Sequence, residues 1–489
     1  MSSKPAQADK RRQTAPPSPS NGAQRCINYK CGAAFGLNDR IYVCPRCGET
    51  LEIEIPLNKT ADPAAMREQW SSRAVFRAAS ADARDASGVW RYQEMLPFAA
   101  DAPFVTLCEG HTPLFDAPRS AKYCGLAGLR LKHQGFNPTG SFKDTGMAAA
   151  MTQAVISGAR TAVCASTGNT AASLAAYAAR AGLQAAILLP RGQVSPSKLA
   201  QSLDYGALVL EIDGNFDACM RLVQELGDDP SIYVANSINP FRIEGQKTVA
   251  FEIMEQCRWR VPHHVIVPGG NMGNSTALGK GFQELLDLGL IDRLPKLSVI
   301  QAEGAAPLAR LFATLDTKKS NVADQIPEKL EPIENPQTMA TAIKIGAPIS
   351  WKKSLRAVLR SGGQIISVSE GEIADAKAMI GRDSSGCEPA SATTVAGIKR
   401  LVAAGTILIN DDVVAVLTGH ALKDPSYMIS YHEGTLDFGH KEGGGDAPAP
   451  ARAKETSAAQ KAFAGEFRNA PERVAASKAA ILSSLERKR

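Results

Sequence analysis

The chain has 489 residues, of which 44% are hydrophobic and 21% charged, and its formal net charge is +6 at pH 7. This length exceeds one ordinary hydrophobic core and predicts two domains with appendages, in a globular protein of enzyme size. No run of 18 apolar residues occurs, which excludes an ordinary membrane-spanning helix.

The positive charge is concentrated at the two ends of the chain. Residues 1–25 hold five basic side chains and one acidic, and residues 450–489 hold nine basic and four acidic. We interpret these ends as solvated tails and not as a nucleic-acid-binding surface. Residues 1–25 are rich in Pro, Ser, Gln and Lys and are predicted to be disordered. They also lack the apolar core of a secretory signal, so we expect a cytoplasmic protein.

Four of the ten cysteines lie close together near the N-terminus. Cys44 and Cys47 stand in the sequence CPRCG, which has the spacing of a zinc knuckle. Cys26 and Cys31 have four residues between them where a zinc ribbon usually has two, and Asn28 stands where the expected ligand would be. Two alternatives stay open: a ribbon that binds structural zinc through these four cysteines, and a degenerate ribbon that folds on its own small core.

After this module the sequence pattern changes twice. Residues 62–99 contain two predicted helical segments, WSSRAVF and VWRYQEMLPF. From about residue 104 to 440, short β-branched or apolar runs alternate with alanine-rich helical segments, for example TAVCAS followed by NTAASLAAYAARAG. This alternation predicts an α/β fold with parallel sheets and right-handed crossovers. Ligands in such folds bind at the carboxyl ends of the strands.

Three loops at predicted strand ends carry polar residues. The first, GFNPTGSFKDTG at residues 135–146, places Lys143 at a strand-to-helix corner. The second, at residues 165–170, offers hydroxyl groups and helix N-terminal N–H groups to an anion. The third, PGGNMGN at residues 268–274, has glycines that let backbone N–H groups converge on a phosphate. Each loop alone is an ordinary turn, but a lysine able to form a Schiff base beside two anion-binding loops indicates a pyridoxal phosphate site.

Five sequence blocks follow one another across roughly residues 104–440: GFNPTGSFKDTGM, CASTGNTAAS, NSINPFRIEGQKT, VPGGNMGN and LTGHALKDP. Together they resemble the threonine synthase family of fold-type II pyridoxal-phosphate enzymes. The SFKD-type block occurs throughout the fold-type II group, whereas NSINPFRIEGQKT is far more specific. The resemblance implies two parallel or mixed-sheet α/β domains of the tryptophan synthase β-like architecture, preceded by a small zinc-ribbon-like module.

The pattern and the resemblance together divide the chain. We expect a disordered tail (1–25), a zinc-ribbon-like module (26–55), a large cofactor domain (56–155 and 250–440), a small α/β domain (156–249), and a linker with a helical tail (441–489). The helical tail is predicted from the spacing of Val474, Ile481, Leu482 and Leu485, and it would dock or extend as helices.

The resemblance also implies roles for the loop residues around the cofactor. Lys143 would bind the cofactor covalently and later move protons, and partial desolvation behind Phe142 would favour the neutral amine. Asn169 would donate a hydrogen bond to the phenolic oxygen of the cofactor, and Thr418 would face its pyridine nitrogen. The cofactor phosphate would be held by Gly270, Asn271, Met272, Gly273 and Asn274.

On the substrate side, the resemblance implies two anion-binding groups. Ser166 and Thr167 would bind the carboxylate of an amino acid. A second anion at the far end would be held by Thr170, Asn236, Ser237 and Arg242. An arginine fork suits phosphate oxygens, so this arrangement fits O-phosphohomoserine.

Two simpler interpretations of the same residues stay open. Arg242 could form a structural ion pair with Glu244, two residues along the chain. Asn236 and Ser237 could cap the helix predicted to begin after Pro240.

The family reaction converts O-phospho-L-homoserine and water to L-threonine and phosphate by β,γ-elimination and replacement, the last step of threonine biosynthesis. The alternatives are another fold-type II lyase, such as a threonine or serine dehydratase, and a non-catalytic homologue that binds the cofactor. NSINPFRIEGQKT and the intact Lys143 favour the synthase. The resemblance further suggests a homodimer and S-adenosylmethionine as a candidate effector, and we expect no nucleic-acid or membrane partner.

Overall fold

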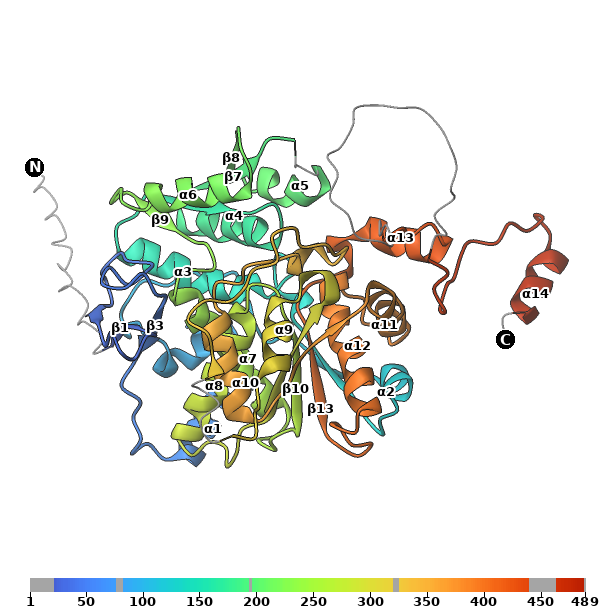
Figure 1. Cartoon of the computed structure of the whole chain (residues 1–489), viewed down its shortest axis with the longest axis horizontal. Helices are drawn as coiled ribbons and strands as arrows, with labels where there is room; N and C mark the ends of the chain where they lie inside the picture. The colour runs from blue at the N-terminus through green and yellow to red at the C-terminus, as the bar shows by residue number, and fades with distance from the viewer. Residues whose placement is uncertain (1–21, 76–81, 193–195, 320–324, 439–462, 488–489) are drawn as a thin grey trace, which may run out of the picture.

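The computed structural model describes residues 22–75, 82–192, 196–319, 325–438 and 463–487 (Figure 1). Its strands form three sheets: one of three strands near the N-terminus, one of six and one of four. Most of the expected tail 1–25 and the whole of the expected linker 441–454 lie outside the described residues. Among the described residues, no helix has both the length and the apolar character needed to cross a membrane.

The three-stranded sheet belongs to the cysteine module. It is antiparallel in the order β2-β1-β3, formed by β1 (Ala23–Cys26), β2 (Ala34–Gly36) and β3 (Leu51–Glu54). The module therefore begins at Ala23, three residues before the boundary that the sequence predicted.

The six-stranded sheet is parallel except at one edge, where β4 pairs antiparallel with β5. Its order is β12 (Ile365–Val368), β11 (Lys296–Ala302), β10 (His264–Pro268), β13 (Val413–Leu417), β5 (Arg130–His133) and β4 (Leu114–Asp116). Every residue of β10 and β13 is buried. Alternate residues of β13 join two separate apolar cores, one on each face, because successive side chains of a strand point to opposite sides.

The four-stranded sheet is entirely parallel. Its order is β8 (Leu208–Ile212), β7 (Gln184–Pro190), β6 (Thr161–Ala165) and β9 (Ile232–Val234). The two parallel sheets confirm the predicted α/β architecture.

Five helices begin next to the polar loops identified in the sequence. They are α3 (Lys143–Ile156), α4 (Asn169–Ala181), α7 (Phe241–Gln256), α8 (Gly273–Asp287) and α12 (Pro389–Ala403). Helix α7 packs against both α3 and α8, and Figure 1 shows it near β10 and below α3. The first turns of these three helices lie close together, because Gly245 lies against Thr145 and Gly273 lies near Ile243.

The remaining helices cover the sheets or extend from them. They are α1 (Pro63–Val75), α2 (Pro118–Cys124), α5 (Pro196–Asp204), α6 (Phe216–Leu226), α9 (Pro307–Thr314), α10 (Trp351–Ser361), α11 (Glu370–Arg382), α13 (Pro425–Glu433) and α14 (Lys478–Arg487). Short 3-10 helices span Trp90–Met95, Gln134–Phe136, Glu303–Ala305, Thr341–Ile343 and Ala421–Lys423.

The predicted tail is helical over α14, which stands away from the sheets in Figure 1. The tail was predicted from four apolar side chains, and all four are exposed: Val474, which precedes α14, and Ile481, Leu482 and Leu485 within it. The helix therefore extends and does not dock. The C-terminal segment is anchored earlier, where Phe463 packs against Tyr431 of α13.

Candidate active site

Lys143 is the first residue of α3 and lies beside the end of β13. The backbone N–H of Phe142 donates a hydrogen bond to the carbonyl oxygen of Thr418, over 2.9 Å. Ser141 forms an antiparallel bridge with Gly419. The loop of Lys143, which the resemblance implied would bind the cofactor covalently, therefore lies beside the loop of Thr418, which it implied would face the pyridine nitrogen.

The Lys143 amine is held in an environment that disfavours its charge. Its Nζ lies 4.3 Å from the centroid of the Phe142 ring. Burial is the main cause that lowers the pKa of Lys143 to about 7, the positive charge of Arg242 adds to it, and the carboxyl of Glu388 acts in the opposite direction. An amine with this pKa is largely neutral just above pH 7, which is the form needed for attack on a carbonyl.

Glu388 is a buried carboxyl at the centre of the site that the sequence reasoning missed. It accepts hydrogen bonds from Asn169 Nδ2 at 2.8 Å and from Thr418 Oγ1 at 3.0 Å. Burial raises the pKa of Glu388, while these two hydrogen bonds oppose the shift. The Ser391 hydroxyl, at 3.0 Å from Thr418 Oγ1, also accepts a hydrogen bond from the Thr418 N–H at 2.8 Å. Glu388 therefore connects the two side chains that were predicted to flank the cofactor ring.

The only sequence signal for Glu388 was weak. It stands directly before Pro389, where α12 begins, and an acidic residue before a proline is an ordinary feature of a helix N-terminus. Its approach to the 418–419 loop is close: a Cβ added to Gly419 would lie 2.3 Å from the Glu388 carboxyl carbon. This packing depends on the tertiary fold and leaves no local pattern.

The loop between β6 and α4 carries Ser166, Thr167, Asn169 and Thr170, all of which are partly exposed. Ser166 Oγ accepts a hydrogen bond from the N–H of Gly168 at 3.2 Å. Because α4 has 13 residues and begins at Asn169, its first N–H groups have no acceptor within the helix. The loop therefore presents hydroxyl and N–H donors together, which suits a carboxylate.

Asn236, two residues after β9 of the four-stranded sheet, holds this loop in place. Its Oδ1 accepts from the Ala165 N–H at 3.0 Å, and its Nδ2 donates to the Ala165 carbonyl oxygen at 3.1 Å. The amide predicted to bind a substrate anion is thus already engaged with the last residue of β6. Ser237, the next residue, is partly exposed.

Arg242 is buried, with 2% of its surface exposed, and its guanidinium is not neutralised by any carboxylate within the described residues. Nη1 donates to the Ala235 carbonyl oxygen at 3.1 Å, and the buried Nε has no hydrogen-bond acceptor in the part of the chain described here. Burial lowers the pKa of Arg242 to about 10. A buried cation without a counter-ion is costly, so this geometry calls for an anion.

Both simpler interpretations of this segment are wrong. Glu244 forms its ion pairs with Lys247 and Lys280, and not with Arg242. The cap of α7 is also made elsewhere, because Asn239 Oδ1 accepts the hydrogen bond from the Phe241 N–H at 3.0 Å. Asn236 and Ser237 therefore do not cap this helix.

The loop between β10 and α8 has the features of a phosphate site. Met272 has a left-handed backbone with φ of 63°, which turns the chain so that α8 begins at Gly273. Both polar atoms of the buried Asn274 side chain lack a hydrogen-bond partner in the described structure. Asn271 instead accepts a hydrogen bond through Oδ1 from the Ile349 N–H at 2.7 Å. An unpartnered buried amide at the N-terminus of a 15-residue helix fits the phosphate of the predicted cofactor.

The four N-terminal cysteines are also brought together, far from Lys143 in sequence. The sulfur atoms of Cys26, Cys31, Cys44 and Cys47 all lie within 4.8 Å of one another. Cys26 reaches this cluster across the wide Cys26–Cys31 turn, so the unusual spacing does not separate the sulfurs.

Comparisons with known proteins show the family of this chain. The family described as "Pyridoxal-phosphate dependent enzyme" matches residues 105–419. Threonine synthase of Methanocaldococcus jannaschii is 44% identical over 411 residues, which cover 84% of this chain and 95% of the relative. Threonine synthase of Methanosarcina acetivorans is 42% identical over 411 residues, covering 84% and 94%. Threonine synthase of Mycobacterium tuberculosis (strain ATCC 25618 / H37Rv) is 44% identical over 340 residues, covering 69% and 89%.

Solved structures show the same architecture at low sequence identity. Diaminopropionate ammonia lyase from Escherichia coli has a TM-score of 0.55 at 17% identity, over 81% of this chain and 96% of its own. Maize serine racemase has a TM-score of 0.53 at 20% identity, over 64% and 88%. These similarities concern the fold alone and confirm the predicted fold-type II architecture.

Proposed function

The chain belongs to the threonine synthase family of pyridoxal-phosphate-dependent enzymes, and from this we propose that it converts O-phospho-L-homoserine and water to L-threonine and inorganic phosphate. The observation that carries the choice of substrate is Arg242, a buried guanidinium that no carboxylate of the described residues pairs with and whose charge acts on Lys143. A substrate with an amino group for the cofactor and a phosphate for Arg242 satisfies both groups at once.

The residues present fit pyridoxal phosphate. Lys143 would bind it covalently, the 270–274 loop would hold its phosphate, and Asn169 and Thr418 would contact its ring. When bound, the cofactor supplies an electron sink that makes the hydrogens on the substrate's α carbon acidic. Glu388 is a positioning residue for the cofactor ring. Its carboxyl accepts hydrogen bonds from Asn169 and Thr418 and so fixes the two side chains that would contact the ring.

Lys143 moves the protons of the reaction through its Nζ. With a pKa near 7, the amine accepts a proton from carbon at neutral pH and returns it without a large energetic penalty. Its position at the start of α3, directly after the partly exposed Phe142, lets it reach the substrate from one side.

Two groups orient the substrate around that amine. The Ser166–Thr167 hydroxyls and the N-terminus of α4 bind the carboxylate, and Asn236 holds this loop in place through Ala165. Arg242, assisted by Thr170 and Ser237, binds the substrate phosphate. Because its charge is fixed, Arg242 also stabilises the phosphate as it leaves the γ carbon.

An assay of both products tests the proposal. The protein, loaded with pyridoxal phosphate, is given O-phospho-L-homoserine, and phosphate and threonine are each measured over time. We expect equal amounts of the two. Formation of 2-oxobutyrate from threonine, without threonine production from the phosphorylated substrate, would assign the chain to the dehydratases. Cofactor binding without either reaction would assign it to the non-catalytic homologues.

The family also supports three finer proposals: a cytoplasmic location, a homodimer and activation by S-adenosylmethionine. Light scattering during gel filtration tests the dimer. The same product assay with and without S-adenosylmethionine tests activation. The predicted domain boundaries are likewise proposals, tested by limited proteolysis near residues 156 and 250.

A further inference from the structure

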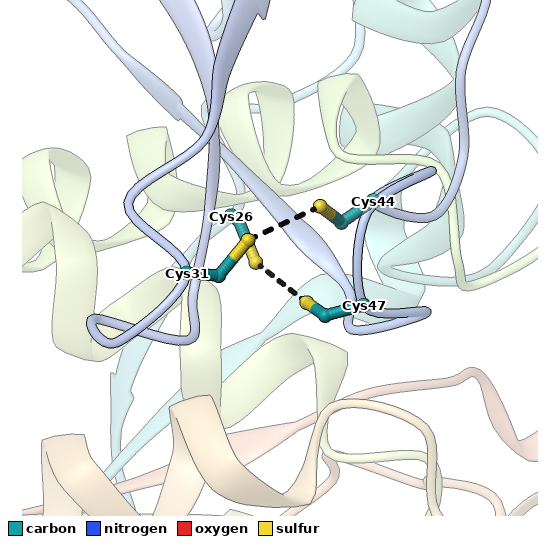
Figure 2. A group of neighbouring side chains, drawn as sticks. All are labelled: Cys26, Cys31, Cys44 and Cys47. Carbon is teal, nitrogen blue, oxygen red and sulfur yellow. Dashed lines mark hydrogen bonds between the residues drawn. The ribbon is translucent and has the colours of Figure 1, made fainter.

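The four cysteines bring their sulfur atoms as close together as a four-coordinate metal site requires (Figure 2). The sulfurs of Cys26 and Cys47 are 3.4 Å apart, and those of Cys31 and Cys44 are 3.7 Å apart. Four sulfurs at zinc's usual bond length of about 2.3 Å would be separated by about 3.8 Å. The observed distances are close to that value and well above the roughly 2.05 Å of a disulfide bond. Four thiolates suit zinc or iron, and the CPRCG knuckle favours structural zinc.

A tight turn at residues 28–32 places Cys31 beside the other sulfurs, although four residues separate it from Cys26. Cys31 N–H donates to the Asn28 carbonyl oxygen at 2.9 Å, and Gly32 follows with φ of 60°. Gly48 after Cys47 has φ of 73°, so both knuckles end in the same left-handed turn. Asn28 stabilises the first turn instead of ligating the metal, since its Oδ1 accepts from the Lys30 N–H at 3.0 Å.

The module has too small an apolar core to be stable without help. Its buried cluster consists of Cys26, Ala33, Cys44 and Leu51, with three partly buried neighbours. Two of these four buried residues are cysteines of the metal site. Domains of about thirty residues generally need a metal or disulfides to fold, so a metal held by the four sulfurs would supply stability that this small core lacks.

The loop between β2 and Cys44 attaches the module to the edge of the four-stranded sheet. The hydroxyl of the half-buried Tyr42 accepts a hydrogen bond from the Val234 N–H at 2.8 Å, and its ring meets Tyr233 edge-on with centroids 6.1 Å apart. Arg40 donates to the Pro230 carbonyl oxygen. β9 is the edge strand of its sheet, so Tyr42 satisfies an N–H that no neighbouring strand pairs.

The opposite side of the module is attached to the helices that cover the six-stranded sheet. Lys280 of α8 donates to the Ile53 carbonyl oxygen at 2.5 Å, and Lys353 of α10 donates to that of Leu51 at 3.0 Å. Arg356 donates to the Ile27 carbonyl oxygen at 3.1 Å. The cysteine module therefore contacts both parallel-sheet units at once.

These attachments surround the segment that carries the predicted phosphate-binding residues. Val234, bonded to Tyr42, lies two residues before Asn236. Phe241, directly before Arg242, packs against Leu37 and Ile53 of the module. The segment 234–242 is thus fixed by the module at both of its ends.

We propose that the cysteine module binds one zinc ion and, when loaded, acts as a clamp that holds the four-stranded sheet against the helices of the six-stranded sheet and thereby positions the 234–242 anion-binding segment. The metal site and the clamp stand independently of the catalytic assignment. Only the effect on substrate affinity rests on the proposed function.

Metal analysis tests the first half of the proposal. The full-length protein, purified without chelators and dialysed against trace zinc, is measured by mass spectrometry of its metals together with the C44S/C47S double variant. We expect about one zinc per chain in the wild type and loss of at least nine-tenths of it in the variant, since half of the ligands are gone. A wild-type protein without stoichiometric zinc would overturn the proposal.

Hydrogen exchange tests the clamp without using any substrate. Tyr42→Phe removes only the hydroxyl that holds Val234, and Tyr29→Phe makes the same change at a ring that is 84% exposed. We expect Y42F to keep its zinc but to exchange the Val234 amide about tenfold faster, with Y29F unchanged. In C44S/C47S, faster exchange should extend over residues 230–242. Unchanged exchange of this segment in both Y42F and C44S/C47S would contradict the clamp.

Kinetics then connect the clamp to the proposed reaction. Y42F should raise the KM for O-phosphohomoserine about two- to tenfold, with kcat and the visible absorbance of the bound cofactor close to those of Y29F. An equal KM in Y42F and Y29F would remove the positioning role. A protein that contains zinc and shows the exchange pattern but forms no threonine would refute the proposed function alone.

Discussion

Gly245 of α7 lies against Thr145 of α3 so closely that a Cβ at Gly245 would be 1.9 Å from the Thr145 carbonyl oxygen. The two helices begin at Lys143 and Phe241, which places the predicted cofactor lysine and Arg242 at neighbouring helix starts. Backbone contact between two helices therefore sets the relative positions from which the amine and the guanidinium extend.

Gly245→Ala tests this helix contact. The added methyl group must push the helices apart, so we expect a loss of about 1–3 kcal/mol in the free energy of unfolding and lower kcat/KM. Urea denaturation and steady-state kinetics measure the two effects. Gly381→Ala is the matched control, because Gly381 also lies in a helix but nothing lies within 4 Å of its Cβ position. G381A should be neutral or slightly stabilising; equal behaviour of the two variants would refute the contact.

The pH dependence of cofactor capture follows from the lowered pKa of Lys143. The neutral amine is the reactive form, so the rate at which cofactor-free protein binds pyridoxal phosphate should rise about tenfold between pH 6 and pH 8 and then level off. Stopped-flow absorbance measures this rate. A rate that keeps rising up to pH 10 would show an ordinary lysine pKa.

The same shift affects the stability of the cofactor-free protein. Between about pH 7 and the ordinary lysine range the unfolded chain binds a proton at Lys143 that the native state does not, so the contribution of this residue to stability rises with pH there. Lys143→Met, which has no titratable group, should lose this part of the pH dependence in urea denaturation. It should also lose the visible absorbance of the bound cofactor.

Glu388→Ala should weaken cofactor binding. The substitution leaves Asn169 Nδ2 and Thr418 Oγ1 without their shared acceptor, at a cost of about 1–3 kcal/mol, or roughly 5- to 150-fold in the dissociation constant for pyridoxal phosphate. Glu388→Gln keeps the size and an acceptor oxygen, so its effect should be smaller. Absorbance titration gives both constants. If E388A and E388Q bind the cofactor as tightly as the wild type, Glu388 does not position these side chains.

Arg242→Lys should separate substrate binding from cofactor binding. Lysine keeps the positive charge but loses the planar fork, so we expect the KM for O-phosphohomoserine to rise about 10- to 100-fold with the cofactor absorbance unchanged. Arg191→Lys is the control, because Arg191 forms a surface ion pair with Asp213 and its side chain is 70% exposed. A normal KM in R242K would show that the phosphate is bound elsewhere.

The sequence was sufficient for the parts of the fold that have local patterns. Alternating apolar and alanine-rich segments predicted the parallel sheets, and the polar loops before Lys143, Asn169 and Gly273 lie where helices begin. Glu388 was missed because its partners are about 30 and 220 residues away, while its neighbours resemble an ordinary helix cap.

The hydrogen-bond and ion-pair partners of buried polar groups also could not be predicted from the sequence. Nothing near Asn236 indicates that its amide is engaged with Ala165, and the nearness of Glu244 to Arg242 suggested an ion pair that does not form. The fourth sulfur of the cysteine cluster was uncertain for the same reason, because the path of the Cys26–Cys31 turn depends on the three-dimensional structure of the module.

The central claim is that this site releases phosphate from the γ carbon of an amino acid and adds water at the β carbon. Simultaneous measurement of phosphate and L-threonine from O-phospho-L-homoserine, with the cofactor-loaded wild-type protein, tests it most directly. We predict one threonine for each phosphate throughout the reaction. Phosphate release without threonine, or no turnover of the phosphorylated substrate by a protein that shows full cofactor absorbance, would contradict the claim.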